Sequence, residues 1–152
     1  VMEVNFFGAV HIVKASLEAL RERRGTIVVT SSIAGLGPLA ARCGYSASKH
    51  ALHGLFNTVR AELEREGVHV MLVCPGFTDT AIEDAALAGS GGRAVRRTVG
   101  KLARPEEVAE AVLRGVVSRR RMLVLTPVGK LSHLVLRVAP GLYERLMARR
   151  ML

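Results

Sequence analysis

Three short runs of mostly apolar residues constrain the fold more than any other feature of this sequence. They cover residues 26–30, 68–73 and 122–126, and a longer segment with helical spacing of apolar residues precedes each of them. An apolar run of this length is typical of a strand covered on both faces, as the strands of parallel sheets are. Helices that alternate with such strands predict an α/β fold with a doubly wound parallel sheet.

The helical segments have clear ends. Residues 1–23 form the first, which Gly25 ends; residues 45–66 form the second, which Gly67 ends. A third opens at Pro105, with two acidic residues in its first turn. The stripe expected to face the core in the second helix consists of Ala47, Ala51, Leu55, Val59 and Leu63.

The composition is that of a folded protein, with 49% hydrophobic and 23% charged residues in a chain of 152. The sequence opens directly on the apolar segment at Val4, so we expect it to begin within a domain; a small complete domain that starts with a helix is the alternative. The histidines and cysteines form no metal-binding set. Two cysteines without a secretory leader indicate a cytoplasmic protein with reduced thiols.

The positive charge is concentrated near the end of the chain. The net charge is +9, and residues 119–152 contain eight basic residues and one acidic residue. We divide the chain into residues 1–128 and a basic amphipathic helical tail, residues 129–152. The tail either covers a substrate pocket or subunit interface, which we favour, or lies on an anionic membrane surface. Nucleic acid is not an expected partner, because aromatic interleaving and a known binding module are missing. No apolar run is long enough to predict a membrane-spanning helix.

The candidate reactive residues follow the strands. Ligands of doubly wound sheets bind beyond the carboxyl ends of the strands, where Ser32 and residues 75–80 are expected. Tyr45 and Lys49 begin the next helix one turn apart, so they share a face. An ammonium close to a phenol stabilises the phenolate, and such a tyrosine can exchange a proton with a carbonyl or hydroxyl oxygen. A surface pair on an ordinary helix is the alternative for these two residues taken alone.

Two further polar residues fit the same site. Ser32, at the end of a strand, could hydrogen-bond a substrate oxygen beside Tyr45, or it could simply terminate the strand. Asn5 lies in an apolar helix, and a buried amide needs a partner. That partner is either local backbone or a water molecule that links Lys49 to solvent.

Five segments taken together resemble the short-chain dehydrogenase/reductase superfamily, from the first residue to about Thr126. The matching segments are residues 4–8, 27–35, 45–51, 75–80 and 104–109. Each match alone is modest, but all five stand in the family's order and spacing. The resemblance implies the catalytic, C-terminal portion of a Rossmann-like domain, an incomplete doubly wound sheet.

The resemblance also implies roles for individual residues. Tyr45 would be the general acid/base, and Lys49 would lower the tyrosine's pKa and hold the cofactor's ribose hydroxyls. Ser32 would polarise the substrate oxygen, and Asn5 would anchor the water of a proton relay. The remaining cofactor contacts around the nicotinamide of NAD or NADP would come from Pro75, Gly76, Thr78 and Thr80.

The chain departs from the family in one respect. The glycine-rich phosphate turn and the Asn-Asn-Ala-Gly-like strand end of the family's N-terminal half do not occur in it. Residues 89–92 are glycine-rich but do not join a strand to a helix, so we interpret them as a hinge in a lid over the substrate.

We therefore predict an NAD(P)-dependent oxidoreductase that acts on a small or lipophilic alcohol or ketone and forms a homo-oligomer at full length. Two other classes remain as alternatives. One is a truncated, non-catalytic interaction module; the other is a peripheral membrane protein that binds through its tail, in which case the cytoplasmic protein is membrane-associated.

Overall fold

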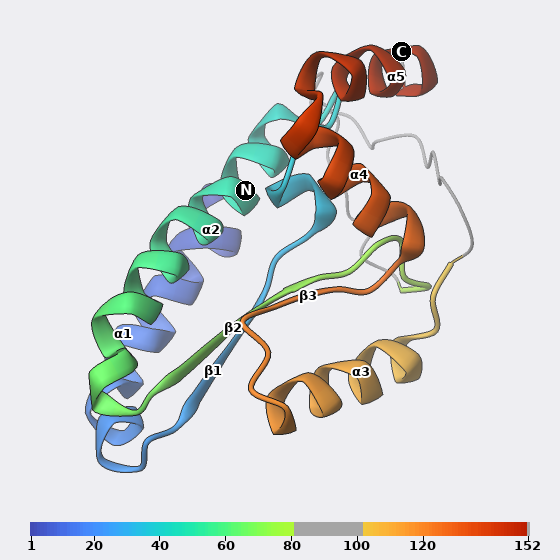
Figure 1. The fold of residues 1–152 in the computed structure, drawn as a ribbon. Helices are drawn as coiled ribbons and strands as arrows, with labels where there is room; N and C mark the ends of the chain where they lie inside the picture. The colour runs from blue at the N-terminus through green and yellow to red at the C-terminus, as the bar shows by residue number, and fades with distance from the viewer. Residues whose placement is uncertain (81–101, 152) are drawn as a thin grey trace.

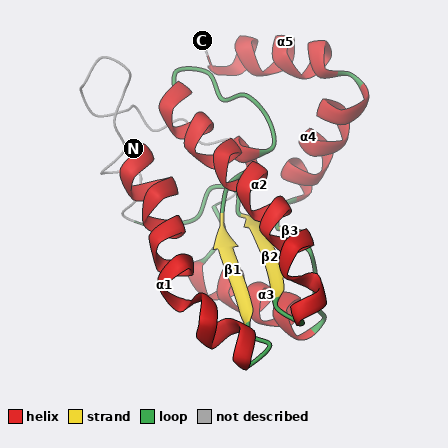
Figure 2. Cartoon of the chain, turned by 90° about the vertical axis from the view of Figure 1, so that its left-hand side faces the viewer, coloured by secondary structure: helices red, strands yellow, loops and turns green. Residues whose placement is uncertain are grey.

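The structure, a computed structural model, describes residues 1–80 and 102–151. Its centre is a parallel sheet of three strands in the order β1-β2-β3. The strands are β1 (Thr26–Thr30), β2 (His69–Cys74) and β3 (Met122–Val124). Helices α1 (Gly8–Glu22) and α2 (Cys43–Leu63) cover one face, and α3 (Pro105–Val117) lies on the other (Figures 1 and 2). The predicted α/β class and parallel sheet are confirmed, and the sheet is incomplete; the predicted hinge at residues 89–92 lies outside the described residues.

The two longer strands differ in burial. All six residues of β2 are buried, because β2 lies between the other strands. In β1, Ile27 and Val29 are buried against α1 and α2, whereas Val28 points to the other face and is 38% exposed. The prediction that both strands are covered on both faces was therefore wrong for β1, which is an edge strand in the described part of the chain.

The face that α2 turns to the sheet also differs from the prediction. Leu52, Phe56 and Leu63 are buried in the core, in line with the fully buried Ser48. The predicted stripe is shifted by one position: apart from Leu63, its members are not buried, and Leu55 and Val59 line a groove between α1 and α2. The two stripes are neighbours on one helix, and their similar apolar content hid the difference of 100°.

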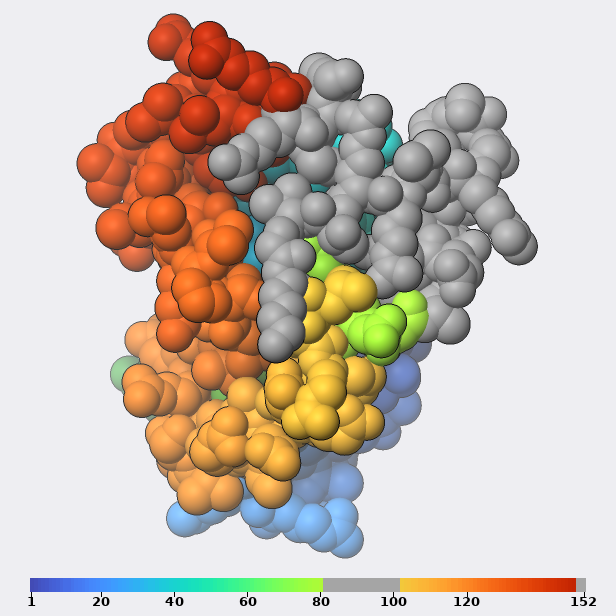
Figure 3. All heavy atoms as spheres, turned by 90° about the vertical axis from the view of Figure 1, so that its right-hand side faces the viewer, coloured from blue at the N-terminus to red at the C-terminus, as the bar shows by residue number. Residues whose placement is uncertain are grey.

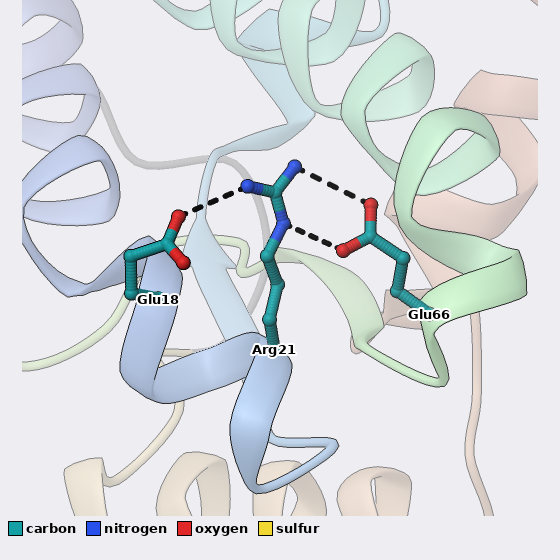
Figure 4. Close-up of polar contacts among 3 residues, drawn as sticks. All are labelled: Glu18, Arg21 and Glu66. Carbon is teal, nitrogen blue, oxygen red and sulfur yellow. Dashed lines mark hydrogen bonds and ion pairs between the residues drawn. The ribbon is translucent and has the colours of Figure 1, made fainter.

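Helix α1 is joined to the end of α2 at the surface. Arg21 pairs with Glu18 of its own helix at 3.1 Å and with Glu66 at 2.6 Å (Figure 4). Glu66 belongs to η3 (Glu64–Glu66), the 3₁₀ turn that follows α2. Because exposed ion pairs are screened by water, apolar packing between the helices and the sheet holds this layer together.

On the opposite face, α3 begins at Pro105 as predicted. It approaches the sheet closely at Gly115, where an added Cβ would lie 3.0 Å from the sulfur of Met71. A larger residue at this position would push α3 away from β2, so the glycine sets the distance between helix and sheet.

The end of the chain folds into two helices, α4 (Pro127–Val138) and α5 (Pro140–Met151). Thr126 caps α4 by accepting a hydrogen bond from Gly129 N at 3.0 Å. The break between the two helices falls just before Pro140. Within the described ranges, no helix is both long and apolar enough to cross a membrane.

Candidate active site

The candidate site lies beyond the carboxyl ends of β1 and β2. The backbone continues the pairing of the strands there: Ser31 N donates to Val73 O at 2.8 Å, and Ile33 N donates to Pro75 O at 3.4 Å. The segments after the two strands are therefore side by side, as the rule for parallel sheets predicts.

Tyr45 and Lys49 meet at the start of α2. The Lys49 Nζ lies 5.7 Å from the centre of the Tyr45 ring, within the range of a cation–π contact. The same Nζ donates a hydrogen bond to the carbonyl oxygen of Thr30, the last residue of β1, at 3.0 Å. Burial lowers the pKa of Lys49 from its ordinary value. The ammonium is thus held between the ring and the strand end, in a half-buried position where water screens its charge only in part.

Ser32 belongs to a segment that is attached to the same turns of α2. Its Oγ accepts a hydrogen bond from Ala34 N at 3.1 Å and so caps the 3₁₀ helix η2 (Ile33–Gly35). On either side, Ser31 Oγ donates to Lys49 O at 3.5 Å and Ser46 Oγ donates to Ala34 O at 3.0 Å. The Ser32 oxygen uses a lone pair in its cap, so its O–H can still donate to a substrate oxygen.

Asn5 reaches the site from the turn that precedes α1. It lies in η1 (Glu3–Phe7), a π-helical turn of the kind that often marks functional positions. Its Nδ2 donates to Ser48 Oγ at 3.0 Å, and Ser48 Oγ donates to Tyr45 O at 2.7 Å. The amide therefore bonds the turn of α2 between Tyr45 and Lys49, a partner that neither sequence interpretation named.

The residues after β2 lie next to the segment that follows β1. Gly76 is close to Thr126, whose Cγ2 would lie 2.7 Å from a Cβ added to the glycine. Thr78 donates to Gly76 O at 3.4 Å and forms a parallel bridge with Ala103. Thr80 is exposed, and the residues that follow it lie outside the described part of the chain.

His53 and Cys74 meet where α2 contacts the end of β2. Cys74 Sγ is 3.7 Å from His53 Nε2, which lies one helical turn after Lys49. Burial raises the pKa of the Cys74 thiol to about 12 and lowers the pKa of His53 to about 4. Both groups are therefore neutral near pH 7, and they join α2 to the end of β2 without a charge.

Sequence reasoning missed several polar residues of this region. They share the property of bonding α2, β1 or β2 to one another around the site: Ser31, Ser46, Ser48 and His53. Ser48 stands four residues before Leu52 and so lies on the buried stripe of α2, which the sequence alone did not distinguish from the neighbouring stripe. For the others, the partner is known only once the tertiary structure is.

Helices α4 and α5 pack over the loop that leaves the site. Gly129 lies against Ile33, since an added Cβ would be 2.6 Å from its Cδ1. Farther along, Leu136 and Tyr143 enclose Gly37, and Ala40 N donates to the sulfur of Met147 at 3.2 Å. One face of the tail therefore covers residues 33–40 rather than standing apart from the sheet.

Comparison with known proteins gives the same family for this arrangement. The family profile described as short chain dehydrogenase matches residues 1–90. Dehydrogenase/reductase SDR family member 7B of Danio rerio is 36% identical over 99% of this chain, and the protein of the same name from Xenopus laevis is 38% identical. These matches cover 50% and 48% of the two relatives.

Solved structures agree in fold. A short chain dehydrogenase from Burkholderia cenocepacia in complex with NADP superposes with a TM-score of 0.82 at 25% identity, over 96% of this chain and 56% of that one. An alcohol dehydrogenase from Thermococcus sibiricus complexed with 5-hydroxy-NADP gives a TM-score of 0.63 at 27% identity, over 82% of this chain and 51% of that one.

The chain belongs to the short chain dehydrogenase family. It spans about half the length of the curated relatives that it matches. The family resemblance read from the sequence is therefore confirmed, and the active-site roles of individual residues stay predictions.

Proposed function

We propose that the protein carrying this chain is an NAD(P)-dependent oxidoreductase that transfers a hydride between a nicotinamide and an alcohol or ketone, with Tyr45 as the general acid/base. The observation that carries the proposal is the position of the Lys49 ammonium, 5.7 Å from the Tyr45 ring at the carboxyl edge of a parallel sheet. Membership of the short chain dehydrogenase family supports the reaction class.

The proton chemistry follows from this pair. Lys49 holds a positive charge beside the Tyr45 ring, in a half-buried position where water screens that charge only in part. In ketone reduction, the Tyr45 hydroxyl gives its proton to the oxygen of the substrate; in alcohol oxidation, the phenolate takes it back.

The residues present fit a nicotinamide cofactor. Among the described residues, Lys49 Nζ donates one hydrogen bond, to Thr30 O, and its other two N–H donors suit ribose hydroxyls. Gly76 packs closely against Thr126, since an added Cβ would lie 2.7 Å from its Cγ2, so the glycine keeps the segment after β2 next to the start of α4. Pro75, Gly76, Thr78 and Thr80 would surround the nicotinamide ring, which supplies or accepts the hydride.

Ser32 and Asn5 have supporting roles in the proposal. Ser32 would donate its O–H to the substrate oxygen and hold it beside Tyr45. Asn5 would anchor a relay water with its side-chain oxygen or its backbone carbonyl, because its Nδ2 already bonds Ser48. The substrate would be a small or lipophilic alcohol or ketone, and the full-length protein would act as a homo-oligomer.

The test is an absorbance screen of the full-length protein with NADH and NADPH against a panel of ketones, followed by Tyr45→Phe. Turnover should fall by about 10²–10⁴-fold, the usual contribution of a general acid, with cofactor binding nearly unchanged. Tyr143→Phe is the matched control, because Tyr143 is the other of the two tyrosines in the chain. Turnover that survives Tyr45→Phe would refute the assignment of the acid/base.

A second variant separates the two roles of the lysine. Lys49→Ala should weaken cofactor binding as well as turnover, since the ammonium serves both the phenol and the ribose. Lys14→Ala on the exposed side of α1 is the control and should change neither. A protein with intact fold that binds neither nicotinamide would instead favour the non-catalytic interaction module.

A further inference from the structure

Helices α4 and α5 expose large apolar side chains that no part of the described structure covers. In α4, Leu131 is 62% exposed, Leu134 59% and Val138 77%. Their spacing of three and four residues places them along one side of the helix. In α5, Leu142 and Leu146 repeat the pattern, one turn apart and about half exposed.

A lack of packing is not the reason why these side chains are exposed, because another side of each helix already contacts the protein. The opposite side of α4 is already used, since Gly129 lies against Ile33 and Leu136 against Gly37. In α5, Met147 accepts a hydrogen bond from Ala40 N. Each helix therefore has one side fixed to the protein and another side, rich in leucine and valine, directed outward. Figure 3 shows α4 and α5, orange to red, as one upper corner of the molecule.

Basic residues accompany the apolar ones. Lys130 and Arg137 stand seven positions apart in α4, so they lie on the same side of the helix, and both are exposed. Exposed Arg145 and Arg149 repeat this in α5, where Glu144 is the one acid; α4 has no acidic residue. We call the exposed apolar and basic residues of the two helices the α4–α5 face.

We propose that the α4–α5 face docks on an anionic membrane surface. An apolar side bordered by lysine and arginine is the pattern of helices that lie in the membrane interface, where leucine and valine enter the acyl region and the cations meet lipid phosphates. A second copy of the chain fits less well, because a two-fold contact would bring the same cations together without acidic partners.

Docking would bring the bilayer close to the candidate active site. The loop of residues 33–40, which α4 and α5 cover, begins directly after Ser32. If the proposed oxidoreductase function holds, this position favours a lipophilic ketone or alcohol that reaches the site from the bilayer. The docking itself does not depend on catalysis, and it is tested without a measurement of activity.

The first experiment is co-sedimentation of the protein with phosphatidylcholine vesicles, with and without phosphatidylserine. A basic residue near an anionic surface contributes about fivefold to the partition coefficient, so Lys130→Glu/Arg137→Glu should lower it at least about 25-fold. The matched control, Arg23→Glu/Arg65→Glu, makes the same charge change on exposed residues at the other end of the sheet and should leave partition within about twofold.

The second experiment reads insertion at one position. The chain contains no tryptophan, so Leu134→Trp introduces a single reporter, and Leu113→Trp on α3 is a control of similar exposure (65%). Brominated lipid should quench the emission of Trp at position 134 and spare the control. The proposal would be overturned if the protein did not bind vesicles, or if both charge variants lost binding equally. It would also be overturned if both positions were quenched equally, or if the protein formed a dimer in solution that Leu134→Trp disrupts.

Discussion

Asn5 and Ser48, 43 positions apart in the sequence, are joined by a side-chain hydrogen bond of 3.0 Å. Ser48 is fully buried, and its own hydroxyl donates a hydrogen bond to Tyr45 O at 2.7 Å. The π-helical turn before α1 is thus bonded to the first turns of α2, where Tyr45 and Lys49 lie. This contact ties the position of the Tyr45 backbone to the packing of two helices.

We expect Ser48→Ala to destabilise the protein by about 1–3 kcal/mol, because it removes the acceptor of the Asn5 amide and leaves a half-buried donor without its partner. Urea unfolding followed by circular dichroism measures the change. Ser16→Ala is the control, since Ser16 bonds the backbone of its own helix. Equal stability of the two variants would mean that the Asn5–Ser48 bond contributes nothing.

Arg60 donates hydrogen bonds to backbone carbonyls where the short strand β3 has not yet begun to pair with β2. Its Nε donates to Val70 O at 2.8 Å and its Nη2 to Arg121 O at 2.9 Å, whereas the pairing of β2 with β3 begins only at Leu72. Arg60→Met should cost about 2–5 kcal/mol, because two carbonyls lose hydrogen bonds from a charged donor. Thermal unfolding compares it with Arg65→Met, an exposed arginine two positions past the end of α2. A difference below the scatter of the measurement would contradict this role.

The sequence predicts this structure best where the signal is local. The apolar run of β1 matches its observed bounds, Thr26–Thr30, and Pro105 begins α3, because strand patterns and helix caps depend on neighbouring residues. The closeness of Tyr45 and Lys49 is local as well, since one helical turn separates them.

Predictions that needed tertiary information were less complete. The face of α2 was misplaced by one position, because the stripe of Leu55 and Val59 and that of Leu52 and Phe56 are equally apolar in sequence. The choice between them depends on how α1 packs. Likewise, no sequence pattern relates Arg60 to the carbonyls of Val70 and Arg121. They lie just before the point where β2 and β3 begin to pair, and only the structure shows where that point is.

We predict that His53 makes stability depend on pH. Burial is the largest cause that lowers the pKa of His53 from 6.5 to about 4, and repulsion from nearby basic side chains such as Arg60 adds to it. The unfolded chain therefore binds a proton that the folded protein does not, so stability should fall as the pH drops from about 6.5 to 4 and level off below. His53→Gln should reduce this fall, whereas His11→Gln on the surface of α1 should keep it. Urea midpoints across this range provide the measurement, and an unchanged slope in His53→Gln would count against the prediction.

Two glycines provide a matched pair for the contact between η2 and α2. A Cβ added to Gly35 would lie 2.6 Å from Ser31 Oγ and 2.9 Å from Lys49 O, a backbone atom that moves only if α2 moves. Gly54, an exposed residue within α2, has nothing within 4 Å of such a Cβ. The same substitution should therefore have opposite effects at the two positions.

Gly35→Ala should destabilise the protein by about 1–3 kcal/mol through overpacking. Gly54→Ala should stabilise it by about 0.5–1 kcal/mol, because alanine loses less backbone entropy than glycine in a helix. In the full-length protein, Gly35→Ala should also lower turnover, since the displaced turn carries Lys49. Urea unfolding gives the first two values and the nicotinamide absorbance assay the third. If Gly35→Ala keeps full stability, the segment after Ser32 is not held against α2 as closely as the structure has it, and the proposed role of Ser32 loses its structural support.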